Sequence, residues 1–271
     1  LGKPDWKIGI LPGTYTSQLA FPADQAYRYG TVADPLKSLF GRARIRPASD
    51  LGSQTWTEHA TGVWKTAFAA LPPTWWAPYT RPTNMYVDGK HLANMATSVA
   101  GVGGDFFYWD SATGTLYVPS PGRPSSVLVA VDNPTPAGLE KRNGSVIEDI
   151  DLELPRTHCI DWRDVQDLTI RRCGFKNAYG IGVYCHADRA GPAAGTLDGL
   201  TIVDCTVDGT GWSGIHVVGI SNLTGYAFGT SAKPIRVERN TCINTVRRRE
   251  ADAVLPELFT PKTNAAIKFY G

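Results

Sequence analysis

The sequence lacks the features that mark a membrane protein or a nucleic-acid-binding protein. No stretch approaches the roughly 18 consecutive apolar residues that a membrane-spanning helix needs. The 27 basic and 25 acidic residues give a net charge of +2, which is too small to attract nucleic acid or an anionic membrane surface. Neither is therefore expected as a partner.

The five cysteines lack the C-x-x-C spacing of a metal site, so no metal ligand is predicted among them. Two of them, Cys173 and Cys205, occupy the same place in two similar stretches, LTIRRCGF and LTIVDCTV. We predict that these two residues stack one strand apart, within reach of a disulfide but reduced. All five thiols are expected to be mostly buried.

A repeated pattern of short alternating strands covers the second half of the chain. Apolar residues recur at equivalent positions of successive units, and each such row of side chains is here called a file. The first strand carries the file Ile147, Ile170, Ile202 and Val237, and the second strand carries the file Leu152, Phe175, Val207 and Cys242. The third strand reads Cys159–Trp162, Gly180–Val183, Gly214–Val217 and Ala266–Phe269. Three short strands per unit, with glycine and asparagine between them, predict a stacked parallel solenoid.

Two of the repeat units are lengthened at the same point, by the loops HADRAGPAAGTLD and GISNLTGYAFGTSAKP. Insertions at one fixed point of a repeat lie on the same edge of the stack. The two loops are therefore predicted to form one wall of a groove.

These repeats, of the form LTI-x-x-C/N-x-F/V … G-I-x-V, resemble the right-handed parallel β-helix of the pectate-lyase-like superfamily over residues 144–271. The segment WKIGILPGTYTSQLAF resembles the first turn after the N-terminal capping helix of that superfamily. Because neither that helix nor a closing segment is present, we expect a longer biological protein. Alternatively, a further chain, as in a homotrimer, covers the open ends.

The repeat pattern disappears between residues 46 and 132, where antiparallel strands and turns such as Ser111–Gly114 are predicted. The stretches YVDGK and FYWDSATGTLYV resemble the small β-sandwich inserted after the first turn of some β-helix glycoside hydrolases. We predict an all-β protein with first turns at 1–45, an inserted β-sandwich at 46–132 and further turns at 133–271. Trp75 and Trp76 either stack on a sugar or pack the insert against the helix, and packing is favoured.

Strand alternation places two files of side chains on the outer face of the third strand. With Ile160, Ile181, Ile215 and Ile267 inward, the first outward file is Asp161, Gly182, His216 and Lys268. The second outward file is Arg163, Tyr184, Val218 and Tyr270. Gly182 is predicted to leave a notch between Asp161 and His216. In the superfamily this strand lines the substrate groove, so the resemblance implies an oligosaccharide or polysaccharide substrate.

Two cleavage reactions fit these residues. Hydrolysis needs two carboxylates about 5 to 9.5 Å apart, for which Asp161 and Asp188 are the candidates. Elimination on a uronic acid needs a base, a proton donor and a cation: Lys268 or His216, Tyr184 or Tyr270, and Arg163. Hydrolysis is slightly favoured, because of the insert. No cofactor is required, although many β-helix lyases use Ca²⁺.

His186 and Trp212 are further candidates for substrate binding, although a loop histidine is more often simply solvated. A non-catalytic glycan-binding rod, such as a phage tail spike or adhesin, is the third alternative. The outward positions of the first strand do not supply the apolar stripe of such a trimer: Thr169, Arg171, Thr201, Val203, Arg236 and Glu238. A secreted or extracellular protein is expected, and a periplasmic one is also compatible.

Overall fold

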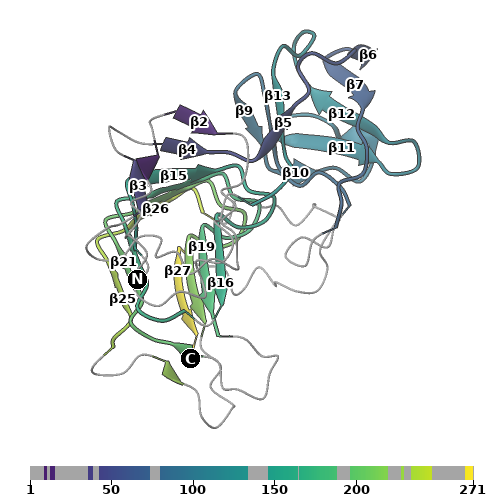
Figure 1. The fold of residues 1–271 in the computed structure, drawn as a ribbon. Coiled ribbons are helices and arrows are strands. Elements are labelled where there is room, and N and C mark those ends of the chain that lie inside the picture. The colour runs from purple at the N-terminus through teal and green to yellow at the C-terminus, as the bar shows by residue number, and fades with distance from the viewer. Residues whose placement is uncertain are drawn as a thin grey trace.

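The computed structural model describes residues 9–10, 13–15, 36–38, 43–73, 80–133, 146–163, 165–187, 196–218, 227–228, 233–245 and 266–270. In this part of the chain every regular element is a strand except one 3-10 turn, η1 (Val99–Gly101), so the protein is all-β (Figure 1). Among these described residues, no helical segment is long and apolar enough to cross a membrane.

Three parallel sheets form the larger part of the molecule, which we call the three-sheet body. The first contains β1 (Gly9–Ile10), β3 (Leu36–Ser38), β14 (Val146–Glu148), β17 (Thr169–Arg171), β21 (Thr201–Val203) and β25 (Arg236–Glu238). The second contains β2 (Gly13–Tyr15), β4 (Ala43–Ile45), β15 (Ile150–Glu153), β18 (Gly174–Lys176), β22 (Thr206–Asp208) and β26 (Thr241–Ile243). The third contains β16 (Ile160–Arg163), β19 (Val183–His186), β23 (Ile215–Val218) and β27 (Ile267–Tyr270).

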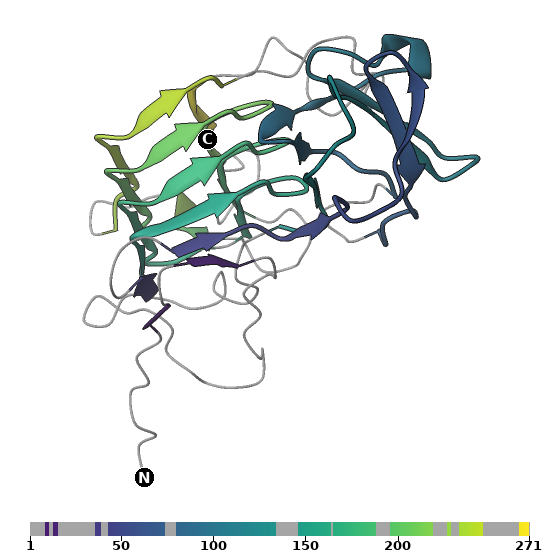
Figure 2. The same cartoon turned by 90° about the horizontal axis from the view of Figure 1, so that it is seen from above.

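From β14 onward the chain visits the three sheets in a fixed order, and each new strand pairs with its counterpart from the preceding unit. Figure 2 shows these strands stacked in order of colour. The predicted files are confirmed on two sheets: Ile147, Ile170, Ile202 and Val237 are in register, as are Leu152, Phe175, Val207 and Cys242. Together with Ile160, Val183 and Ile215, these side chains form the apolar core between the sheets.

The corner between the first and second sheets carries Cys173, Cys205 and Asn240 at equivalent positions of successive units. The Cys205 thiol faces the carbonyl oxygen of Ile170 at 3.8 Å, and the Asn240 amide donates to the carbonyl of Ile202 at 2.8 Å. Asn240 Oδ1 also accepts from the backbone N–H of Cys205 at 2.9 Å. Cys173 and Cys205 are buried and are free thiols here.

The same corner is turned in each unit by one residue in the left-handed region, with φ between 53° and 59°: Asp149, Arg172, Asp204 and Arg239. These residues alternate in charge along the stack. Arg172 pairs with Asp149 at 2.9 Å, and Arg239 with Asp204 at 2.7 Å. Because the pairs are largely exposed, they contribute little stability individually.

Between β4 and β14 the chain forms two further sheets that share one apolar core, here called the insert (Figure 1). One sheet contains β10 (Asn94–Met95), β11 (Phe106–Asp110), β12 (Thr115–Pro119), β7 (Val63–Ala67) and β6 (Thr57–Ala60). The other contains β5 (Ala48–Asp50), β13 (Val127–Ala130), β8 (Met85–Val87) and β9 (Lys90–Leu92). Most pairs are antiparallel, and the predicted turn at Ser111–Gly114 joins β11 to β12. Trp75 and Trp76 lie outside the described residues.

A buried carboxylate, Glu153, ties the insert to the three-sheet body. Its side chain is 7% exposed and accepts hydrogen bonds from the Tyr86 hydroxyl at 2.5 Å and from Arg46 Nη2 at 2.8 Å. Arg44 Nε lies 3.2 Å from the same carboxylate, and the Arg46 guanidinium sits over the Tyr86 ring. Asn177 on the body donates to the Tyr86 hydroxyl. This network fixes β8 of the insert against β15 and the residue that follows β18.

Candidate functional site

The third sheet brings most of the predicted site residues together, in a register that differs from the predicted one on β19. Asp161 pairs with Tyr184, which pairs with His216, which pairs with Lys268. The second file is Arg163, His186, Val218 and Tyr270. The predicted files, with Gly182 beside Asp161 and Tyr184 beside Arg163, were therefore wrong by two residues on this strand.

The shift has a physical reason. Val183 and Cys185 are fully buried and fill the inward positions of β19, whereas Ile181 lies in the turn before the strand. A slip of two residues preserves the alternation of inward and outward side chains, so the periodicity cannot detect it. Gly182 leaves no notch. A β-carbon there would lie 2.5 Å from Val207 Cγ1 and 2.7 Å from the carbonyl oxygen of Gly214.

Asp161 and His186 form a hydrogen-bonded pair at the centre of this face. His186 Nε2 lies 3.2 Å from Asp161 Oδ1, and the side chains are 13% and 10% exposed. Burial acts to raise the pKa of Asp161, but the hydrogen bond with His186 and the neighbouring basic groups, Arg163 among them, outweigh it, so the pKa lies below its usual value. An ionised carboxylate can only accept, so Nε2 of His186 carries the hydrogen and Nδ1 is left as the basic atom of the neutral ring. His186 lies on β19 rather than in a loop, which corrects the prediction.

The Tyr184 ring is surrounded by three imidazoles. It stacks on His186 with a centroid distance of 4.4 Å and an interplanar angle of 15°. The rings of His216 and His158 lie 5.3 and 5.4 Å away at tilted angles. A phenol hydroxyl and several imidazoles within one cluster provide hydrogen-bond donors and acceptors of the kind that take part in proton transfer.

His158 is a member of this cluster that the sequence analysis missed. It precedes β16, outside the alternating strand positions, and it is 8% exposed. The signal lay in the turns before the strands, where Tyr179, His158 and Trp212 place one ring in each unit. Trp212 is 7% exposed, and its ring lies 5.8 Å from His158 and 6.3 Å from Tyr179. Trp212 therefore packs against the other rings of the cluster and exposes little surface on which a sugar could stack.

The remaining candidates are described only in part. Lys268 and Tyr270 are placed by backbone register, next to His216 and Val218. Asp188 lies outside the described residues. The two predicted wall loops meet where β20 (Thr196–Leu197) pairs with β24 (Ala227–Phe228).

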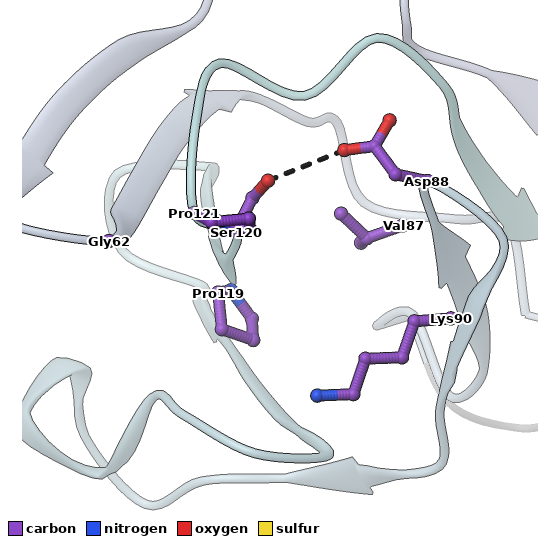
Figure 3. Close-up of a pocket in the computed structure, with 7 residues that line it drawn as sticks. All are labelled: Gly62, Val87, Asp88, Lys90, Pro119, Ser120 and Pro121. Carbon is purple, nitrogen blue, oxygen red and sulfur yellow. Dashed lines mark hydrogen bonds between the residues drawn. The ribbon is translucent and has the colours of Figure 1, made fainter.

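Two other kinds of site bear on function. The part of the chain that the structure describes holds no group of three His, Cys, Asp or Glu side chains arranged to bind a metal ion. A hollow of about 400 Å³ in the insert (Figure 3) is lined by Gly62, Val87, Asp88, Lys90, Pro119, Ser120 and Pro121. Its two charges are already engaged: Asp88 accepts from Ser125 and Ser126, and Lys90 donates to the carbonyl of Gly104. It is therefore a weaker candidate than the third sheet.

Comparison with protein-family models, curated proteins and solved structures gives no match to this chain. The assignment of function consequently depends on the geometry of the third sheet.

Proposed function

We propose that this protein cleaves a uronic-acid-containing polysaccharide by β-elimination at the outer face of the third sheet. The observation that carries the proposal is the group formed by Asp161, His186 and Tyr184: an oriented base stacked on a phenol. Among the described residues of this face, Asp161 is the only carboxylate, and it is committed to His186. This set of residues suits elimination, which needs a base and a proton donor, better than hydrolysis, which needs two carboxylates.

The proposal includes the fold family. The three-strand unit that repeats through β14–β27 supports a right-handed parallel β-helix of the pectate-lyase-like superfamily. The resemblance then implies that the third sheet lines a glycan-binding groove. Secretion or another extracellular location follows from such a substrate and is part of the same proposal.

In the proposed reaction, His186 Nδ1 removes the proton from C5 of the uronate as the C5–H bond breaks. The electron pair forms the C4=C5 double bond, and the C4–O bond to the leaving sugar breaks. The leaving oxygen takes a proton from the Tyr184 hydroxyl. Arg163, in register with His186, supplies positive charge for the uronate carboxylate. Asp161 holds His186 in the tautomer that the first step requires.

Hydrolysis is the second candidate, and the insert favours it. The insert consists of two sheets around one core, attached after β4, as in the β-helix hydrolases that the sequence resembles. This reaction needs a second carboxylate to act with Asp161. Asp188, which follows β19 in sequence, is the residue to test.

The test is incubation with a panel of neutral and uronic-acid polysaccharides, with and without EDTA. Reducing ends and the ultraviolet absorbance of the unsaturated product are both followed. Elimination predicts new reducing ends together with new absorbance. Reducing ends without absorbance would establish hydrolysis and refute elimination. If a folded sample binds a glycan but forms neither reducing ends nor unsaturated product, the protein is a binding module. The EDTA arm shows whether Ca²⁺ takes part.

A further inference from the structure

His158 is held in one tautomer by the backbone. The N–H of Ile181 donates to His158 Nδ1 at 2.9 Å. Because a backbone amide can only donate, Nδ1 must be the unprotonated nitrogen, and the ring hydrogen is on Nε2. Nε2 has no hydrogen-bond partner in the described part of the chain.

The surroundings of His158 also keep the ring uncharged. Burial holds the pKa of His158 below its usual value, against the opposing charge of Asp161. The groups that face it are Asp161 on β16, Tyr184 and His186 on β19, and the Trp212 ring before β23.

The fit of the ring is tight. A β-carbon at Gly180 would lie 2.7 Å from His158 Cε1 and 2.8 Å from Nδ1. Glycine at residue 180 therefore leaves the space that the imidazole occupies.

Two histidines whose rings lie against Tyr184 are thus held in different tautomers. His186 directs its N–H to Asp161 and keeps a basic nitrogen, whereas His158 accepts from the backbone and keeps a free N–H. Environments that hold neighbouring titratable groups in different states commonly mark the acid and base of a site.

We propose that His158 is a second catalytic residue of this site, a neutral imidazole that donates its Nε2–H to the uronate carboxylate of the substrate. The inference depends on the elimination proposed above, and it assigns a second group, beside Arg163, that meets the developing charge. As the C5 proton leaves, negative charge builds on the carboxylate oxygens. A donor that is already oriented stabilises this charge without reorganisation.

The test compares His158→Leu with His158→Gln. Leucine removes both hydrogen bonds, whereas the glutamine amide can accept from Ile181 and still donate an N–H without titrating. We expect His158→Leu to lower kcat by about 10²- to 10³-fold with little change in KM, the usual effect of removing one such donor. His158→Gln should keep most of the wild-type kcat, and its rate should fall at acid pH in the same way as the wild-type rate. His59→Leu, on an exposed strand of the insert, is the matched control for the substitution.

Each outcome bears on a different part of the inference. A folded His158→Leu variant with wild-type kcat would overturn the role of His158 alone. Loss of the acid limb in His158→Gln would make His158 a titrating base and also overturn it. Should the leucine variant fail to fold, imidazole ¹⁵N NMR of the wild-type protein decides, because titration of His158 between about pH 5 and 8 contradicts a neutral donor. A folded wild-type protein that forms no unsaturated product would refute the elimination itself.

Discussion

Glu153 offers a sharp test of how the insert is held to the three-sheet body. The substitution Glu153→Gln keeps the shape of the side chain and removes its charge. The carboxylate is 7% exposed and lies against Arg46, which is 16% exposed, and Arg44, which is 40% exposed. Neutralising one partner of a buried ion pair costs about 3 to 5 kcal/mol. Since Arg44 can be solvated, we expect the lower end, about 3 kcal/mol.

The first assay is equilibrium unfolding in urea with tryptophan fluorescence as the signal, and the second is thermal melting. A loss of about 3 kcal/mol corresponds to a decrease in Tm of about 6 to 12 °C for a protein of this size. Asp204→Asn is the matched control, because Asp204 also makes two contacts with one arginine, Arg239, but is 44% exposed. The control should melt as the wild type does. A Glu153→Gln variant with wild-type stability, or an equal loss in Asp204→Asn, would refute the reasoning.

The stability difference between the wild type and Glu153→Gln should depend on pH. Burial acts to raise the pKa of Glu153, but hydrogen bonds from Tyr86 and Arg46 outweigh it, so the folded-state pKa is depressed. Its contribution is therefore fully present above the unfolded pKa of about 4.3 and is lost as the pH falls through the folded value. The difference in stability between the wild type and Glu153→Gln should shrink over that acid range. A difference that is constant with pH would contradict this.

Three further predictions concern single positions. Cys205→Ala should lower the free energy of unfolding by about 1 to 2 kcal/mol. Cys205→Asn should be at least as stable as the wild type, because its amide can donate to the Ile170 carbonyl as Asn240 donates to the Ile202 carbonyl one unit later; urea titration distinguishes the two variants. His158 has a depressed folded-state pKa, so its unfolded form protonates first and stability should fall as pH drops below about 6.5; a melting series in which His158→Gln shows the same fall would contradict this. Gly89→Ala should cost about 1 to 2 kcal/mol because φ is 81° there, whereas Gly122→Ala, in open space, should leave Tm unchanged.

Much of the fold could be predicted from the sequence because it depends on local periodicity. Alternating apolar residues identified the files through Ile170 and Phe175, since each inward position needs an apolar neighbour one unit away. The turn between β8 and β9 is equally local: Asp88 and Gly89 both adopt positive φ, at 47° and 81°, as a tight two-residue hairpin turn requires.

The errors and omissions lie where periodicity carries no information. The register of β19 was wrong because a two-residue slip leaves every side chain on the same face of the sheet. His158 was missed because it lies in a turn, where its role depends on a backbone N–H and on the absence of a side chain at Gly180. The Glu153 network was missed because its partner Tyr86 is 67 residues away in sequence. Contacts of this kind leave no local pattern.

The central claim, that Asp161 orients the base of an elimination site, is tested most directly by one rate comparison. The rate of formation of unsaturated product from a uronic-acid polysaccharide is measured for the wild type, Asp161→Asn and Asp208→Asn. Asp208, on β22 in the second sheet, is the control for the same chemical change. The account predicts a fall of about 10²-fold or more for Asp161→Asn and a wild-type rate for Asp208→Asn. Equal rates for all three proteins would contradict it.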